Sequence, residues 1–392
     1  MDVFFDFDAR ALAHRALEQS GPSFDTPQLP ASKRIAFIGS SSEFGIGSGT
    51  GSAMTIGARQ NCYFYQAGLY LRSLGLPVNL SGRVGDGSEG STASASNGAA
   101  YSAFDERITF SGTSTGWSVH TDVSFGGRNW RAWPSAGLYN LDFAFDEDST
   151  EISFLVGATS ATARSFQYGV DGGTLATFAS SAAQMNRITI PGLVKGKHTL
   201  NLRFPSTAGP SFLVSGFECR DTSRNEIRFL FAGAGGWNTT TTYWTNTTTP
   251  FNAMAMLPIV APNVLVECFG GNEDFTGANS VTDFITRCGT FHAACKAAGI
   301  QTAAIIKPFR FAGGVPPGDH ASASEYAIRD ARIAFAKTLG IPYYDLSAPA
   351  GARSLASANG EMNADNLHYK AAWHARVGRG VGQWLFSSGL LF

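Results

Sequence analysis

The fold is decided by a short stretch near the start of the chain, where residues 35–45 read IAFIGSSSEFG. Four apolar residues followed at once by glycine are typical of a buried β-strand. The serines just past Gly39 would then lie at the carboxyl edge of a sheet, where open α/β folds place their functional sites. This stretch therefore predicts an α/β fold with a serine turn at its functional edge.

Two later segments have the same form. Residues 227–237 read IRFLFAGAGGW, and residues 264–273 read VLVECFGGNE. The glycine at position 236 leaves its backbone N–H open to a ligand, because no side chain stands in the way. The amide of Asn272 can donate a hydrogen bond to a developing oxyanion. Each segment thus predicts a buried strand that ends in a donor for a negatively charged oxygen.

Near the C-terminus, Asp365 and His368 lie three residues apart in the segment ADNLH. On one helical turn, or on a tight loop, this spacing brings both side chains to one face. The carboxylate can then hold the imidazole in one tautomer, and the imidazole can take a proton from a serine hydroxyl. The pair predicts nucleophilic catalysis by a serine.

In order and spacing, these four segments resemble those of the SGNH hydrolase (GDSL-type esterase) superfamily. The resemblance implies a flavodoxin-like, three-layer α/β fold with a parallel sheet. It also implies Ser41 as nucleophile, with His368 and Asp365 as its catalytic partners. The oxyanion hole would be formed by the N–H groups of Ser41 and Gly236 and by the Asn272 amide.

The chain departs from the family pattern at two positions. The aspartate of the family's Gly-Asp-Ser is replaced by Ser40, and the last residue of its Gly-x-Asn-Asp is replaced by Glu273. Because Ser40, Ser41 and Ser42 are adjacent, each is a candidate nucleophile. We choose Ser41 because it keeps the family's offset from Gly39.

The glycine donor also has a rival. Residues 78–86 read VNLSGRVGD and resemble the same family segment, which makes Gly85 an alternative. We prefer Gly236 because an apolar strand precedes it directly. About 35 residues then separate it from Asn272, roughly the length of one αβ unit.

Between residues 81 and 225 the pattern changes to short alternating segments separated by turn residues. The predicted strands are 107–110, 138–145, 151–156, 165–170, 187–190, 198–204 and 212–217. Short strands at this spacing are typical of an all-β sandwich or jelly roll. We therefore predict a β-sandwich at 81–225, inserted into a discontinuous hydrolase domain of residues 34–80 and 226–392. Residues 1–33 would form an N-terminal arm, with a helix near 9–19.

This arrangement resembles SGNH esterases with an inserted module similar to carbohydrate-binding modules, including peptidoglycan O-acetyl esterases. The resemblance implies an O-acetylated polysaccharide as substrate. Exposed rings of Trp130 and Trp133 could stack on sugars, although packing in the core is the interpretation we favour. Trp237 and Trp244, which flank the polar Thr-rich run after the glycine turn, are further candidates for binding the substrate.

Composition limits the other classes of function. The net charge of −1 gives no electrostatic footprint for nucleic acid. No apolar run approaches the length that spans a bilayer. Five scattered cysteines and seven histidines show no zinc spacing, so we expect buried thiols, structural histidines apart from His368, and no metal or cofactor. Acidic residues other than Asp365 are expected to be surface charges.

Two alternatives to the esterase stay open. The chain could be a glycan-binding structural protein, such as a phage tail component with little or no hydrolytic activity, or a sugar O-acyltransferase. The first residues lack the basic head and long apolar stretch of a signal peptide. The compartment stays open between virion tail, cytoplasm and a mature extracellular form, and the N-terminal arm could bind a second copy of the chain or a tail protein.

Overall fold

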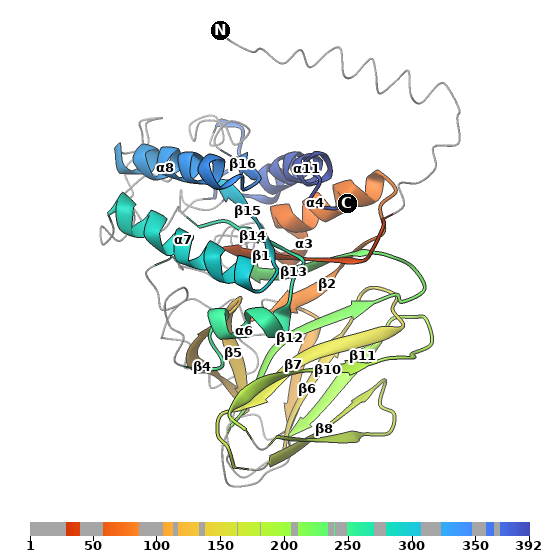
Figure 1. Cartoon of the computed structure of the whole chain (residues 1–392). Helices are drawn as coiled ribbons and strands as arrows, with labels where there is room; N and C mark the ends of the chain where they lie inside the picture. Colours follow the sequence, from red (N-terminus) through yellow and green to blue (C-terminus); the bar gives the residue numbers. More distant parts are fainter. Residues whose placement is uncertain are drawn as a thin grey trace, which may run out of the picture.

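The structure is a computed structural model. It describes residues 29–39, 58–85, 105–112, 117–132, 138–162, 164–180, 182–204, 211–233, 239, 249–269, 280–306, 323–346, 358–363 and 369–392. The helix predicted near residues 9–19 lies outside these ranges. Figure 1 shows a helix-covered set of strands at one end of the molecule and a β-rich region at the other.

Parallel strands form the helix-covered end, which confirms the predicted α/β class. Their order is β2-β13-β1-β14-β15-β16, and every neighbouring pair is parallel. The strands span Val78–Val84 (β2), Ile227–Gly233 (β13), Lys33–Gly39 (β1), Val264–Glu267 (β14), Gln301–Ile306 (β15) and Tyr343–Asp345 (β16). The strands predicted from the runs at 35–38, 227–232 and 264–269 are therefore β1, β13 and β14. They lie side by side.

Helices cover both faces of these strands. On one face, Ile35 and Phe37 of β1 pack in a core cluster with α4 (Tyr63–Ser73) and α11 (Ala371–Ser387). On the other face, Ala36 and Ile38 pack in a second cluster with α6 (Ala253–Val260), α7 (Val281–Ala297) and α8 (Ala323–Leu339). Successive side chains of a strand point to opposite faces, so a strand covered on both faces must be apolar throughout. A short helix, α3 (Ala58–Asn61), precedes α4.

The sheet continues into the β-rich region through one antiparallel contact. Strand β12 (Phe212–Arg220) pairs with β2, so that Gly216 faces Val84 and Phe217 faces Arg83. On the same side, residues Phe212–Val214 of β12 pair with β5 (Gly127–Ala132), and on its other side β12 pairs with β7 (Glu151–Ala158). Strand β10 (Gln184–Ile190) extends β7, and β4 (Trp117–Ser124) extends β5. The predicted boundary between residues 80 and 81 therefore falls inside β2.

A second sheet has the order β3-β6-β11-β8-β9. Its strands span Ile108–Gly112, Tyr139–Ala144, Thr199–Phe204, Arg164–Val170 and Ala176–Ser180 in that order. Phe143 of this sheet stacks on Phe217 of the larger one, with ring centroids 4.2 Å apart, inside one shared core. All seven short strands predicted for 81–225 are present. Because β12 joins β2, an independent inserted sandwich stays a prediction.

A buried carboxylate connects the two regions. Asp105 is fully buried and accepts hydrogen bonds from Arg107 Nη2 at 2.7 Å and Arg83 Nη1 at 3.2 Å. Arg59 of α3 lies 3.9 Å from the same carboxylate and 2.8 Å from Asp146. The expectation that acidic residues other than Asp365 lie on the surface is wrong here. It is also wrong for Glu218, Glu226 and Glu267, which are buried as well.

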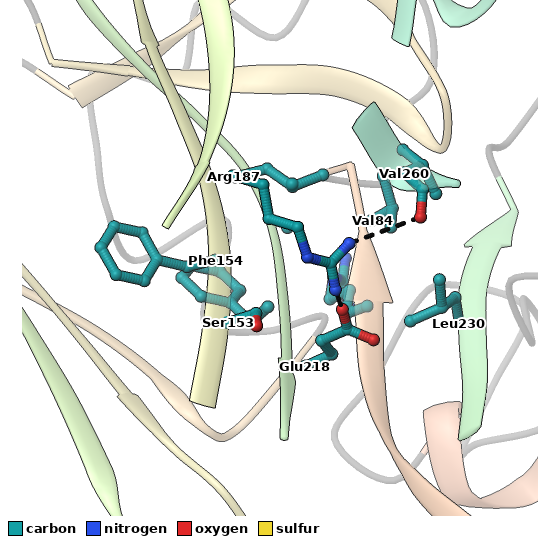
Figure 2. A pocket seen from close by; sticks show the side chains of 11 residues that line it. Val84, Ser153, Phe154, Arg187, Glu218, Leu230 and Val260 are labelled. Carbon is teal, nitrogen blue, oxygen red and sulfur yellow. Dashed lines mark hydrogen bonds and ion pairs between the residues drawn. The ribbon is translucent and has the colours of Figure 1, made fainter. Parts of the chain in front are cut away.

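A second buried carboxylate, that of Glu218, lies near the amino-terminal ends of the parallel strands. Glu218 pairs with Arg187, with Arg34 at 3.0 Å and with Arg228 at 3.4 Å. Figure 2 shows Arg187 between this carboxylate and the carbonyl of Val260, beside a pocket of about 220 Å³ that includes open solvent. The arginines thus bind strands of both regions and the last turn of α6, where cations are favoured.

Replacing Asp105 with asparagine should destabilise the protein strongly, because the buried arginines around it lose their counter-charge. We expect the free energy of unfolding in urea at pH 7 to fall by about 3–5 kcal/mol. Asp148 is exposed, and Asp148→Asn should change the same quantity by less than about 0.5 kcal/mol. Equal stability of the two variants would contradict the proposed role of the carboxylate.

The pH dependence of this effect has a defined sign. Burial raises the pKa of Asp105, but the charge and hydrogen bond of Arg107 outweigh it and hold the pKa well below the ordinary 3.8. The stabilisation is therefore complete above the ordinary pKa and is lost as the pH falls through the folded-state pKa. The stability difference between wild type and Asp105→Asn should be constant above about pH 5 and shrink in acid.

Candidate active site

Three neighbouring strands end together at the carboxyl edge of the parallel strands. In the register of the sheet, Gly39 at the end of β1 pairs with Gly233 at the end of β13. On the other side Ile38 pairs with Glu267, and the N–H of Cys268 donates to the Ile38 carbonyl at 2.9 Å. The segments that follow these strands therefore start next to one another, as expected for parallel strands that share an edge.

These three segments carry the predicted nucleophile and oxyanion donors. The candidate residues themselves lie outside the described residues: Ser41, Gly236, Asn272, Asp365, His368, Trp133, Trp237 and Trp244. The structure consequently determines where the chain enters and leaves each candidate segment. Their assignments stay predictions.

The segment that carries Asp365 and His368 is closed at its base. Met362 and Tyr369 form an antiparallel bridge on either side of it, and the N–H of Lys370 donates to the carbonyl of Glu361 at 2.7 Å. Arg376 of α11 donates to both carboxylate oxygens of Glu361, at 2.8 and 3.2 Å. The two ends of the segment are thus held together and fastened to α11.

Helix α11 is fastened in turn to α4, the helix that follows the serine segment. His374 is fully buried, and its Nδ1 accepts a hydrogen bond from the backbone N–H of Tyr63 at 3.2 Å. Tyr63 is the first residue of α4, whose initial N–H groups have no partner within the helix. His374 therefore caps α4 from α11, which agrees with the structural role predicted for it.

The rival donor Gly85 is already engaged. Its N–H donates to the carbonyl of Ser215 at 2.5 Å, and its φ of 78° lies in the left-handed region. A Cβ at this position would stand 1.8 Å from the carbonyl oxygen of Gly126. Glycine is thus required here by close packing of backbone. Strand β2 is moreover separated from β1 by β13, so the geometry disfavours Gly85 as an oxyanion donor.

Trp130 does not have the setting of a sugar platform. Its side chain is only 1% exposed. The ring lies 5.7 Å from that of Phe217, and the guanidinium of Arg83 lies 5.6 Å from the ring centroid. A ring covered in this way offers no face to a glycan, so substrate binding by Trp130 is wrong and core packing, the interpretation favoured from the sequence, is confirmed.

Two arginines that bind groups near the candidate segments are not recognisable from the sequence alone. Arg332 of α8 binds the end of β14, and Arg287 of α7 donates to Thr239 Oγ1 at 3.0 Å, three residues beyond Gly236. One signal was available in the sequence. Glu267 stands within the apolar run VLVECF, and a carboxylate inside a buried strand needs a charged or hydrogen-bonding partner.

Within the ranges that the structure describes, no group of three His, Cys, Asp or Glu side chains could hold a metal ion. None of the described helices combines the length and the apolarity that a membrane crossing needs. All five cysteines are buried free thiols, as predicted.

Comparison with known proteins identifies the architecture. The sequence matches no family model and no curated protein. Among solved structures it is similar to one described as a peptidoglycan O-acetylesterase in action, with a TM-score of 0.63 and 12% identity over 91% of each chain. At this identity the likeness shows the fold alone.

Two further similar structures have lower scores. One is a family two carbohydrate esterase from Clostridium thermocellum in complex with cellohexaose, with a TM-score of 0.30 and 14% identity over 67% of this chain and 96% of that chain. The other is a protein from Desulfitobacterium hafniense DCB-2 assigned to the G-D-S-L family of lipolytic proteins, with a TM-score of 0.29 and 13% identity over 41% of this chain and 82% of that chain.

The contact between α4 and α11 generates a prediction. A Cβ on Gly378 would stand 2.6 Å from the carbonyl oxygen of Tyr63 and 3.1 Å from the nitrogen of Ala67. Gly378→Ala should therefore push the helices apart and lower the free energy of unfolding by about 1–3 kcal/mol. At Gly289 of α7 the nearest atom is 3.9 Å away, so Gly289→Ala should be neutral or stabilise by up to about 1 kcal/mol. Similar effects in chemical denaturation would contradict the close approach.

Proposed function

We propose that this chain belongs to the SGNH hydrolase superfamily and is a serine esterase that removes O-acetyl groups from a polysaccharide. One observation carries the proposal. Strands β13, β1 and β14 are adjacent and end together, so the segments with Gly236, Ser41 and Asn272 all start at one edge of the sheet. An ester carbonyl at this edge would meet a nucleophile and oxyanion donors supplied by three neighbouring segments.

The proposed reaction needs only side chains and backbone of this chain. His368 takes the proton of the Ser41 hydroxyl while Ser41 Oγ attacks the ester carbonyl, and Asp365 stabilises the resulting imidazolium. The N–H groups of Ser41 and Gly236 and the amide of Asn272 stabilise the oxyanion. The C–O bond to the sugar then breaks, and His368 returns the proton to the departing sugar hydroxyl.

Water completes the reaction by the same path. His368 takes a proton from a water molecule as its oxygen attacks the acyl-enzyme. The ester bond to Ser41 breaks, the serine recovers its proton, and acetate leaves. The engaged N–H of Gly85 favours Gly236 as the backbone donor in this scheme.

The substrate class rests on architecture. The similar structure with a TM-score of 0.63 is described as a peptidoglycan O-acetylesterase and is matched over 91% of both chains, so the likeness extends through the β-rich region as well. We assign β1, β2 and β13 to β16 with their helices to the hydrolase domain, and the strands between β2 and β13 to an inserted sandwich that contacts the glycan. The burial of Trp130 means that other residues of this region would make that contact.

The nucleophile is tested by three matched serine variants. Ser41→Ala should lower kcat on p-nitrophenyl acetate by at least about a thousandfold, because no other group can form the acyl-enzyme. Ser40→Ala and Ser42→Ala should keep kcat within about tenfold, since they leave the nucleophile in place. Circular dichroism would confirm that all three variants are folded. Full activity of Ser41→Ala, or loss of activity only in a neighbour, would contradict the assignment.

The substrate class is tested by acetate release from O-acetylated peptidoglycan, xylan and bacterial capsule. We expect release from at least one polysaccharide, and none with Ser41→Ala. The alternatives give different results. A glycan-binding structural protein would bind without releasing acetate, and an acyltransferase would move the acetyl group to an added acceptor sugar, which product analysis by mass spectrometry would detect.

A further inference from the structure

A buried ion pair lies at the end of β14, just before the segment that carries Asn272. Glu267 is the last residue of β14 and is 1% exposed, and Arg332 projects from α8 and is 2% exposed. Nη2 of Arg332 pairs with Oε1 of Glu267. The guanidinium also lies 5.4 Å from the centroid of the Phe284 ring. Four residues separate Glu267 from Asn272 along the chain.

Arg332 is the cation that balances this carboxylate. A histidine is near as well, since Nε2 of His292 lies 3.9 Å from Glu267 Oε1. Burial lowers the pKa of His292 to about 4, so its ring is neutral near pH 7. Its Nδ1 is bonded to the Thr302 hydroxyl at 2.7 Å. Near pH 7 the charged partner of Glu267 is therefore Arg332 and not His292.

The Arg332–Glu267 pair also binds the backbone of Phe269, just before the segment that carries Asn272. Nη1 of Arg332 donates to the carbonyl of Phe269, and the N–H of Phe269 donates to Glu267 Oε2 at 3.3 Å. Both polar backbone groups of this residue are thus held by the two charged side chains. Phe269 is itself only 1% exposed. Phe269 stands three residues before Asn272, at the point where the chain leaves the sheet.

Stability alone gives little reason for such a pair. Removing two charges from water costs about as much as their attraction returns, and buried pairs often contribute no net stability compared with apolar residues of similar size. Fixed geometry is a better reason, because an oxyanion donor must be held within a fraction of an ångström of its productive position. A misplacement of about 1 Å can lower the rate a hundredfold.

We propose that Arg332 and Glu267 are positioning residues that hold Asn272 at the oxyanion hole through the backbone of Phe269. The inference rests on the proposed esterase function and names the two side chains that support one of its donors. It predicts a defect in the chemical step with little effect on substrate binding.

The first test compares two arginines that each pair with a carboxylate. Arg332→Met should lower kcat on p-nitrophenyl acetate by about tenfold to a hundredfold and leave KM within about twofold. Arg332→Lys keeps the charge but cannot bind carboxylate and carbonyl together, so its kcat should be intermediate. The control is Arg220→Met, which removes a bidentate pair with Glu151 (2.6 and 2.9 Å) in the β-rich region and should keep wild-type kcat. If Arg332→Met lowered kcat no more than Arg220→Met does, the inference would be overturned.

A double-mutant cycle then asks whether Arg332 acts through Asn272. In an Asn272→Ala background, Arg332→Met should change kcat by less than about twofold, because the donor that it positions is already absent. If the two effects multiply, Arg332 acts by another route and the positioning role is wrong. Unfolding curves of each variant would show that the measured protein is folded.

Hydrogen exchange separates the failure of this inference from that of the proposed function. The peptide that contains Cys268 and Phe269 should exchange faster in Arg332→Met, while peptides from β1 and β13 should not change. Unchanged exchange at Phe269 would overturn the inference whatever the activity. If exchange rises but Asn272→Ala keeps wild-type kcat, the oxyanion assignment fails and the positioning role fails with it.

Discussion

The parallel pairing of β1 between β13 and β14 is the constraint on which the rest of the structure depends. Parallel neighbours point their carboxyl ends the same way, and the register Gly39–Gly233 makes two of these ends coincide. Helices cover both faces of the central strand, so its inner residues are apolar. Polar groups for a functional site must therefore lie in the segment that follows the strand. The pairing that builds the core thus also makes the segments with Gly236, Ser41 and Asn272 start next to one another.

Buried charges attach the other elements to this core, and they explain where prediction of the fold failed. The strands β1, β13 and β14 were predictable because apolar runs ended by glycine have few other interpretations. Strand β2 was missed because it reads VNLSGRV, yet all seven of its residues are buried. Asn79 donates to the carbonyl of Cys219, Ser81 to Asp146, and Arg83 to Asp105. These partners come from distant parts of the chain, and a single sequence does not show them.

The candidate site, like the fold, has one part that the sequence predicts and another that it does not. Its chemical groups stay predictions from the sequence, where Ser41, Asn272 and the Asp365–His368 pair belong to short motifs whose residue types fit one mechanism. Their support was not visible, because Arg332 is one of many helical arginines until the fold sets it against Glu267. For Trp130 the sequence left two roles open, and the burial of its ring confirms core packing over a sugar platform. Local motifs predict chemistry, whereas burial is a property of the assembled fold.

The central claim is that Ser41 is activated by groups brought to one edge of the sheet. An alkyl fluorophosphonate, which reacts with activated serines and not with ordinary hydroxyls, measures this most directly. After brief exposure of the native protein, fragmentation mass spectrometry should find a single phosphonylated residue, Ser41, and urea-unfolded protein should remain unlabelled. No adduct on the native protein, or an adduct on a different serine, would contradict the account.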